Sequence, residues 1–303
     1  MEFVIDEKNA GGTVLTFLSR RLSLSHRSVS RLKRIENGIT VNSDHVTVRC
    51  ILKEGDTLCL ALEDTGEEVN RDVVPSSRPV GILYEDEYLV IPDKPAGMPT
   101  HPSHNHRGDC LANSLIGYYS DKPFVFRPVN RLDKDTSGAV IVAKDKHTAA
   151  LLGALIEKRG IRKKYIALLD GVPEPEEGSI ENYIKRKQES IITREVSNIP
   201  CEGAKIARTE YRTLCFANNI SAVECEPLTG RTHQLRVHFA YIGCPILGDT
   251  LYGRASGYIS RQALHAYYLE FVHPVTGKPL TVRSPLPPDM LHAAEKNGLV
   301  VTL

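Results

Sequence analysis

The sequence predicts an α+β protein. Its larger part should be a mixed, mainly antiparallel sheet with a central cleft and flanking helices, and a small α/β domain should lie at the amino end. Two observations support this prediction: apolar residues within 1–62 recur at helical spacing and then alternate, whereas from residue 80 onward most apolar runs are short and strand-like. We therefore expect a small domain at residues 1–62, a linker at 63–79 and a large domain at 80–303.

The small domain begins with two predicted helices. Thr13 can cap the first, and Ser25 can cap the second, which should end at Asn37 and Gly38. The apolar faces are Val14, Leu15, Leu18 and Leu22 in the first helix and Val29, Leu32 and Ile35 in the second. Alternating residues then predict short strands near residues 39–41, 46–48 and 57–62.

Positive charge is concentrated in two segments, although the formal net charge of the chain is only +1. Residues 20–34 contain six cations and no acid, and residues 158–164 contain five cations and no acid. Such segments favour binding of a polyanion. The alternative is a solvated helix face, but such faces usually mix charges of both signs.

The small domain resembles the RNA-binding domain first described in ribosomal small-subunit protein four. The matching stretches are residues 30–34, 37–42 and 52–56. The resemblance implies that this domain binds RNA, and we expect the contacts to come from the cations of the second predicted helix, which are Arg27, Arg31, Lys33 and Arg34. Residues 63–79 are acidic and polar and end in a proline-rich stretch, which suits a linker.

In the large domain, residues 81–91 predict a hairpin and residues 145–159 predict the clearest helix. That helix should bury Thr148, Leu151, Leu152, Leu155 and Ile156, with Gly160 as its stop. A strand is expected at 165–169, a surface loop at 171–181, and strand or helix segments at 223–226, 234–239 and 263–272.

The composition is typical of a soluble protein, with 25% charged and 41% hydrophobic residues. No apolar run reaches transmembrane length and no signal-peptide pattern is present, so we expect no membrane association. The seven cysteines are scattered without a Cys-x-x-Cys pair. This pattern predicts reduced thiols in the cytoplasm and argues against a zinc ribbon.

Asp133 is the best catalytic candidate in the sequence. It lies in the run Asn130–Gly138, which continues into the strand-like run Ala139–Ala143. The Thr, Ser and Gly that follow the acid favour a tight turn, and a turn that leads into a buried strand would hold Asp133 at the floor of a cleft. The alternative is an ordinary turn whose acids face water.

Two distant segments have chemistry that complements this carboxylate. Residues 162–168 place Tyr165 after three cations, and its ring offers a flat face for stacking a base. Residues 226–238 place Arg231 after a Gly turn. Because a buried carboxylate needs a cation, we expect Arg231 to pair with Asp133.

Together these segments resemble the pseudouridine synthases of the RluA type, over about residues 80–290. The specific matches are Arg-Leu-Asp-x-x-Thr-Ser-Gly at 131–138 and Gly-Arg-Thr-His-Gln-Leu-Arg-Val-His at 230–238. The resemblance implies that Asp133 is the essential catalytic acid. It implies that Arg131 fills the space of a flipped nucleotide, Tyr165 contacts the base, Arg231 pairs with the acid and Leu235 lines the pocket. Asn130 and Asp93 depart from residues common in that family, which are His and Asn.

The implied reaction converts uridine to pseudouridine within ribosomal or transfer RNA. Asp133 would attack C1′ as a nucleophile or remove the 2′ proton, and either role uses its ionised form. We expect no cofactor and no metal, because substrate and product are isomers, and we expect a monomer.

Parts of the sequence are also compatible with two other functions. The spacing of His101, His104, His106 and Asp109 allows a metal site, but a polar loop is the better interpretation. The chain could instead be a non-catalytic RNA-binding or ribosome-assembly factor, although the intact set of Asp133, Tyr165 and Arg231 argues against this. His233 and His238 are five residues apart and are expected to be structural.

Overall fold

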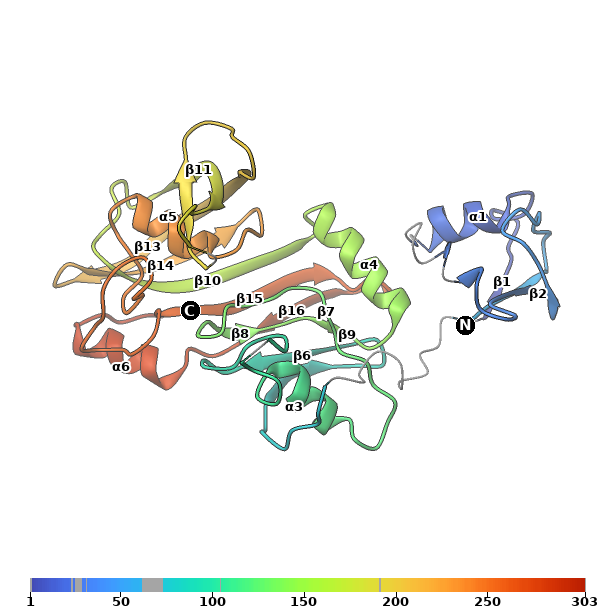
Figure 1. The fold of residues 1–303 in the computed structure, drawn as a ribbon, viewed down its shortest axis with the longest axis horizontal. Coiled ribbons are helices and arrows are strands. Elements are labelled where there is room, and N and C mark those ends of the chain that lie inside the picture. The colour runs from blue at the N-terminus through green and yellow to red at the C-terminus, as the bar shows by residue number, and fades with distance from the viewer. Residues whose placement is uncertain are drawn as a thin grey trace.

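The computed structural model describes residues 2–22, 24, 29–30, 32–61, 73–103, 105–190 and 192–302. These residues form a small sheet at the amino end and a larger sheet of twelve strands (Figure 1). The strands of the larger sheet are β5 (Gly81–Glu85), β6 (Leu89–Lys94), β7 (Arg127–Pro128), β8 (Ser137–Ala139), β9 (Val142–Ala143), β10 (Ile161–Asp170), β11 (Glu177–Arg186), β12 (Arg194–Ser197), β13 (Lys205–Ala217), β14 (Ile220–Pro227), β15 (Leu264–Val272) and β16 (Pro279–Arg283). Its helices are α3 (Leu111–Tyr118), α4 (Lys146–Glu157), α5 (Gln234–Tyr241) and α6 (Pro288–Lys296).

The larger sheet has the order β12-β11-β13-β14-β10-β15-β8-β6-β9-β7, with β16 beside β15 and β5 beside β6. Among the described pairs, only β15 and β8 run parallel. The predicted mixed, mainly antiparallel sheet is confirmed. Strands far apart in sequence meet at its centre, where β10 lies between β14 and β15.

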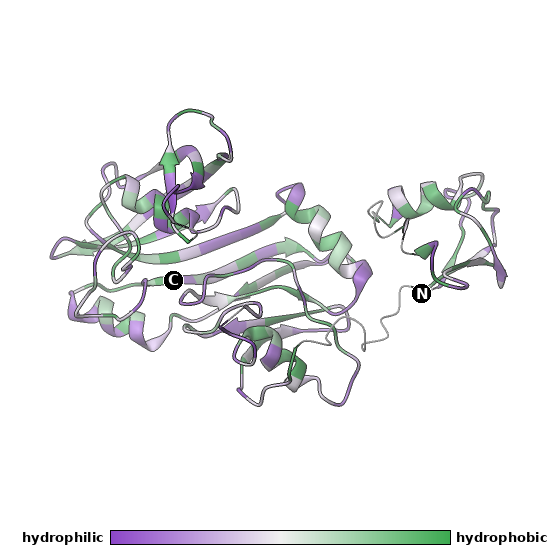
Figure 2. Cartoon of the chain, in the orientation of Figure 1, coloured by the Kyte–Doolittle hydropathy of each residue, from purple (hydrophilic) through white to green (hydrophobic). Residues whose placement is uncertain are grey.

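The run Ala139–Ala143 is apolar throughout because both of its faces are covered. Val140 and Val142 belong to the cluster that contains Leu111 and Leu115 of α3. Ala139, Ile141 and Ala143 belong to the opposite cluster, which contains Leu152 of α4. Figure 2 shows both green and purple on α3 and on α4, as expected of helices that pack one side on the sheet and expose the other.

The predicted helix at 145–159 is confirmed as α4. The Asp145 side chain caps it by accepting a hydrogen bond from the Thr148 amide at 2.8 Å. Its end differs from the expectation, because Arg159 and not Gly160 takes the left-handed conformation, with φ 56°. Gly160 then donates its amide to the Leu155 carbonyl at 2.7 Å.

The amino-terminal sheet has the order β1-β4-β2-β3, with β1 (Glu2–Val4), β2 (Ile39–Val41), β3 (Asp44–His45) and β4 (Thr57–Leu60). Thr13 caps a short helix, α1 (Val14–Thr16), which continues as the π-helical turn η1 (Phe17–Arg21). Residues 25–28 and 31 of the second predicted helix, including Arg27 and Arg31, lie outside the described residues. The apolar cluster of this sheet is separate from the main core but includes the partly buried Ala150 of α4.

The described part of the predicted linker contacts α3. The Ser76 amide donates to the Asn113 carbonyl at 3.0 Å, and the Asn113 side chain donates to the Val74 carbonyl at 2.7 Å. A Cβ on Gly117 would lie 2.1 Å from the Ser76 carbonyl oxygen, so glycine is required for this close approach. No helix in the described ranges is long and apolar enough to cross a bilayer.

Candidate active site

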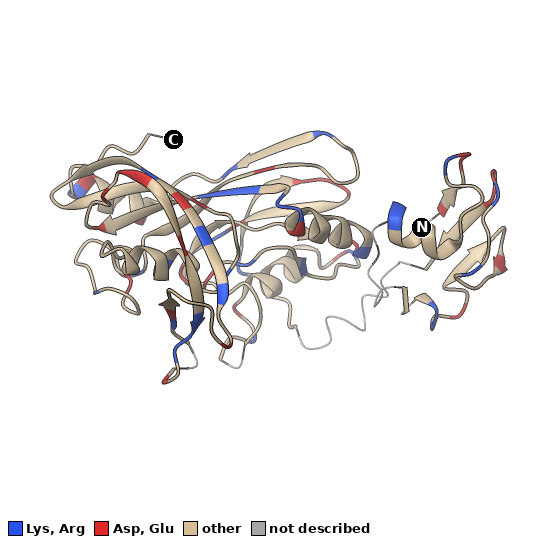
Figure 3. Cartoon of the chain, turned by 90° about the horizontal axis from the view of Figure 1, so that it is seen from above, with Lys and Arg blue, Asp and Glu red and all other residues tan. Residues whose placement is uncertain are grey.

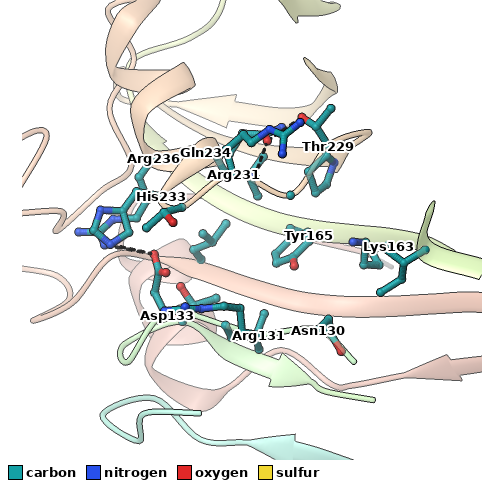
Figure 4. Close-up of a pocket in the computed structure, with 18 of the residues that line it drawn as sticks. Asn130, Arg131, Asp133, Lys163, Tyr165, Thr229, Arg231, His233, Gln234 and Arg236 are labelled. Carbon is teal, nitrogen blue, oxygen red and sulfur yellow. Dashed lines mark hydrogen bonds and ion pairs between the residues drawn. The ribbon is translucent and has the colours of Figure 1, made fainter. Parts of the chain in front are cut away.

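A pocket of about 260 Å³ brings the three predicted segments together. It is lined by residues 129–133 and 136, by Lys163 and Tyr165 of β10, and by residues of the segment 227–236. Asp133, Arg131, Tyr165, Arg231 and Leu235 all line it, and Figure 4 shows Asp133 and Arg131 across the pocket from Arg231. The segments converge because β10 lies beside β15, which pairs in turn with β8 directly after the Asp133 turn.

The Asp133 turn is closed by a hydrogen bond from the Thr136 amide to the Asp133 carbonyl, at 3.1 Å. Thr100 holds its first half, since its hydroxyl donates to the Leu132 carbonyl at 2.9 Å and accepts from the Leu132 amide at 3.2 Å. Gly138 follows with φ 114°, and a Cβ there would lie 2.3 Å from the Ala266 carbonyl oxygen. Glycine at 138 therefore allows the turn to lie directly against β15.

Lys94 holds the same turn through one of the turn's carbonyl groups. Its ammonium is fully buried and donates to the carbonyls of Met98, Pro95 and Lys134 at 2.7, 3.0 and 3.0 Å. Burial lowers the pKa of Lys94 to about 7, although the nearby Asp135 opposes this shift. Because one of its three acceptors belongs to Lys134, this side chain ties the position of Asp133 to the loop after β6.

Arg236, and not Arg231, is the partner of Asp133. The Arg236 Nη1 lies 3.2 Å from the Asp133 Oδ2, while its Nε and Nη2 form a bidentate pair with Asp249 at 2.7 and 2.8 Å. Burial opposes the charge of Arg236, but its hydrogen bonds to Asp249 and its attraction to Asp133 raise its pKa above the ordinary value. The guanidinium is thereby held in place for Asp133.

The predicted pairing of Arg231 with Asp133 was wrong. Arg231 Nε donates to the Ile206 carbonyl at 2.9 Å, on the far side of the pocket. The physical reason is the helix α5, which begins at Gln234 and turns Arg236 toward Asp133. Arg231 precedes this helix, and its amide is fixed by the Gln234 side chain at 3.0 Å.

His233 also faces Asp133, with its Nε2 at 3.8 Å from the Asp133 Oδ2 (Figure 4). On the other side of the ring, Nδ1 lies 2.8 Å from the Tyr252 hydroxyl, which accepts from the Arg194 amide at 2.8 Å. In the neutral tautomer whose Nδ1 accepts from the Tyr252 hydroxyl, the ring proton is on Nε2, which faces Asp133. Burial lowers the pKa of His233, which favours this neutral form.

The sequence does not reveal the position of His233, because residues 234–239 are compatible with either a strand or a helix. Because α5 is a helix, His233 lies just before it and faces the pocket, whereas His238 lies within it and faces the core. His238 is fully buried between Thr209 and Asn182, at 2.9 and 3.1 Å, and is structural as expected. His233 precedes the helix in a left-handed conformation with φ 57°, which directs its ring into the pocket.

The second basic segment is divided by the alternation of β10. Figure 3 shows its consecutive cations as one blue stretch, but their side chains point to opposite faces. Arg162 pairs with Glu226 at 2.9 Å and Lys164 with Glu224 at 2.8 Å, so these two cations are not a free footprint for a polyanion, contrary to the prediction. Lys163 faces the pocket beside Tyr165 without an ion pair to any described residue, and burial lowers its pKa.

The remaining pocket residues have simpler surroundings. Tyr165 and Leu235 are buried, and burial raises the pKa of the Tyr165 hydroxyl, which therefore stays neutral. Arg131 is exposed, as are Lys33 and Arg34 of the amino-terminal domain. Asn130, the departure from the usual His, accepts a hydrogen bond from the Ile141 amide at 2.7 Å and so fixes the start of the turn.

No group of three or more metal-type ligands occurs among the described residues. Of the histidines in the segment considered for a metal, His106 pairs with Asp109 at 2.7 Å, and His104 lies outside the described residues. All seven cysteines are free thiols, as the sequence predicted.

Comparison with known proteins identifies the family. The sequence model of the RNA pseudouridylate synthase family matches residues 88–241, which include Asp133, Tyr165 and Arg236. The uncharacterized RNA pseudouridine synthase YjbO of Bacillus subtilis is 35% identical over 271 residues, covering 89% of this chain and 94% of that protein. The ribosomal large subunit pseudouridine synthase D of Zymomonas mobilis is 39% identical, covering 71% of this chain and 72% of that protein.

A solved structure agrees with these sequence matches. The human RNA pseudouridylate synthase domain containing 4 superposes with a TM-score of 0.60 at 27% identity, covering 78% of this chain and 96% of that one. Fold, pocket and sequence thus lead to one conclusion. The chain belongs to the RNA pseudouridylate synthase family and is an RNA pseudouridine synthase, an enzyme of the isomerase class.

Proposed function

We propose that Asp133 is the catalytic carboxylate of this enzyme and that it acts on a uridine flipped out of ribosomal RNA. The observation that carries the proposal is the position of Asp133 in the pocket, where Arg236 lies at 3.2 Å and Tyr165 lines the same cavity. Arg236 balances the charge of an ionised Asp133, the form that either chemical role requires. The choice of ribosomal over transfer RNA rests on the name of the Zymomonas mobilis relative.

In this proposal, the residues that line the pocket have separate roles in binding the nucleotide. A uridine in folded RNA must leave its stack, at a cost of a few kcal/mol. Arg131, which is exposed at the mouth of the pocket, takes the vacated space, and Tyr165 receives the uracil. Arg231 and Leu235 line the opposite wall and contact the nucleotide there.

Asp133 then breaks the bond between N1 and C1′. It does so by attacking C1′, or by removing the 2′ proton to leave a glycal. The uracil rotates within the pocket and rejoins the ribose through C5, and the proton on C5 is released to solvent while N1 gains one. In its Nε2-protonated neutral form, His233 faces Asp133 and stabilises the charge of the ionised carboxylate before the bond is broken.

The amino-terminal domain has a supporting role in the proposal. Its exposed cations, Lys33 and Arg34 among the described ones, add affinity for RNA outside the target nucleotide. The free thiols of all seven cysteines support a cytoplasmic location, where the RNA substrate is found.

Tritium release tests the proposed reaction and substrate. Purified protein is incubated with ribosomal RNA, and separately with transfer RNA, each carrying tritium at uracil C5. We expect release from ribosomal RNA at a few defined uridines, which primer extension after carbodiimide treatment would locate. Release from transfer RNA alone would contradict the substrate assignment, and no release from either would contradict the proposed function.

A further inference from the structure

We propose that a second pocket, adjacent to the uridine pocket, binds phosphates of the RNA backbone that flank the target nucleotide. This inference rests on the proposed function for the identity of the polyanion. The second pocket has a volume of about 280 Å³ and lies between the ends of β11 and β12, the start of β13 and the turn at residues 230–232. Five cations line it, namely Lys185, Arg186, Arg194, Lys205 and Arg231.

The charges of these cations are largely uncompensated. None of the described residues that line the pocket is acidic. Lys185 has an acidic partner, Glu195, at 3.3 Å. Arg194 and Arg231 donate to backbone carbonyls, which leaves their charges in place. Arg186 and Lys205 are exposed and make no ion pair with a described residue, so the pocket has a clear excess of positive charge.

The strand register brings like charges together. Arg186 of β11 lies directly opposite Arg194 of β12. Lys205 of β13 lies opposite Ile184 of β11. Ile184 is two residues from Arg186, so Lys205 lies near the same end of β11 as the arginine pair. Like charges opposite one another on paired strands are destabilising. A bound anion would remove this repulsion, and an RNA phosphate supplies a full negative charge with several acceptor oxygens.

The two pockets lie on either side of one turn. Gly230, Arg231 and Thr232 line both of them. An RNA strand whose uridine occupies the first pocket therefore passes its neighbouring phosphates over the second. This position also explains why Arg231 points away from Asp133, since its guanidinium stands between the two pockets. Contacts of this kind position the strand and read no sequence.

A pair of charge-removing variants tests the site. Arg186→Gln combined with Lys205→Gln removes the two exposed cations, and Lys122→Gln combined with Lys278→Gln is the control with the same loss of charge at exposed lysines that line neither pocket. Affinity for a fluorescently labelled single-stranded RNA is measured by anisotropy over a range of salt concentrations. Each phosphate contact with a single strand contributes about 0.7 to the slope of log K against log salt.

We expect the test variant to bind RNA more weakly, with its slope reduced by about 1.4, whereas the control keeps the wild-type slope. The single variants Arg186→Gln and Lys205→Gln should each lose about half of that amount. Equal slopes for test and control variants would overturn the proposal. Binding is read without turnover, so a wild-type protein that releases no tritium contradicts the proposed function and leaves the slope comparison intact.

Discussion

Near Asp133, Arg236 and Lys94 are held by buried partners, whereas in the neighbouring basic pocket Arg186 and Lys205 extend into solvent. Arg236 is fixed by Asp249, whose side chain is 0% exposed, and Lys94 is fixed by three carbonyls. Arg186 and Lys205 have no such partners among the described residues. The difference follows from the two tasks, because bond breaking needs catalytic groups held to within about 0.5 Å, while holding a phosphate backbone needs mainly charge.

Removing Arg236 should have the largest effect on stability. Arg236→Met leaves the buried carboxylate of Asp249 without its cation, so the free energy of unfolding should fall by about 3–5 kcal/mol. Arg186→Met, in the open pocket, should change it by less than about 0.5 kcal/mol. Urea unfolding of both variants measures the contrast. Equal losses would show that the two pockets do not differ in rigidity as described.

Buried histidines beside the catalytic pocket should make stability depend on pH. Burial lowers the pKa of His238 to about 4, and that of His265 to about 4, from an ordinary value of 6.5. Between pH 4 and pH 6.5, these histidines bind more protons in the unfolded chain than in the folded one. Stability should therefore be full above pH 6.5 and fall as pH drops toward 4, by up to about 3 kcal/mol for each histidine.

Urea unfolding at pH 7.5 and pH 5 checks this dependence. The variant His238→Gln should show a smaller difference between the two pH values than the wild type, because one of the buried histidines no longer titrates. Identical midpoints for the wild type at both pH values would contradict the assignment of neutral, buried histidines.

His233 should affect turnover more than folding. His233→Phe removes the imidazole whose Nε2 lies 3.8 Å from the Asp133 Oδ2, and turnover at saturating RNA should fall about 10-fold, the equivalent of about 1.4 kcal/mol of charge stabilisation. His233→Gln keeps an N–H donor and should lose less. The contribution is measured by single-turnover tritium release. Equal rates for the Phe variant and the wild type would show that His233 has only the structural role expected from the sequence.

Two neighbouring lysines of β10 give the smallest and most local test. Lys163 faces the pocket, so Lys163→Gln should weaken RNA binding and reduce the salt slope by about 0.7. Lys164→Gln removes an ion pair with Glu224 on the other face and should leave the slope unchanged, with a stability loss below about 1 kcal/mol. RNA anisotropy titrations distinguish them, and a reversed order would contradict the division of this segment by strand alternation.

The sequence predicted the main sheet, α4 and the convergence of Asp133 with Tyr165 because each depends on local patterns or long motifs. The partner of Asp133 was not predictable in the same way. Arg231 and Arg236 lie in one motif, and the choice between them depends on whether α5 is a helix, which its eight residues leave ambiguous. Had residues 234–241 been recognised as a helix, its first turn would have directed attention to Arg236.

The basic segments show a second limit of sequence reasoning. Arg162 and Lys164 have no acid nearby in the sequence, but β14 supplies Glu226 and Glu224 in space. Conversely, the cations of the phosphate pocket are dispersed over residues 185–231, with only Lys185 and Arg186 adjacent, so the pairing of β11, β12 and β13 is what brings them together.

The most direct test of the account compares Asp133→Asn with Asp135→Asn in the same turn. Asp135 does not line the pocket, and its carbonyl, not its side chain, accepts the hydrogen bond from Arg261. Tritium release from ribosomal RNA should fall at least about 1,000-fold for Asp133→Asn and stay near the wild-type rate for Asp135→Asn. Near-normal release by Asp133→Asn, with RNA binding retained in both variants, would contradict the central claim.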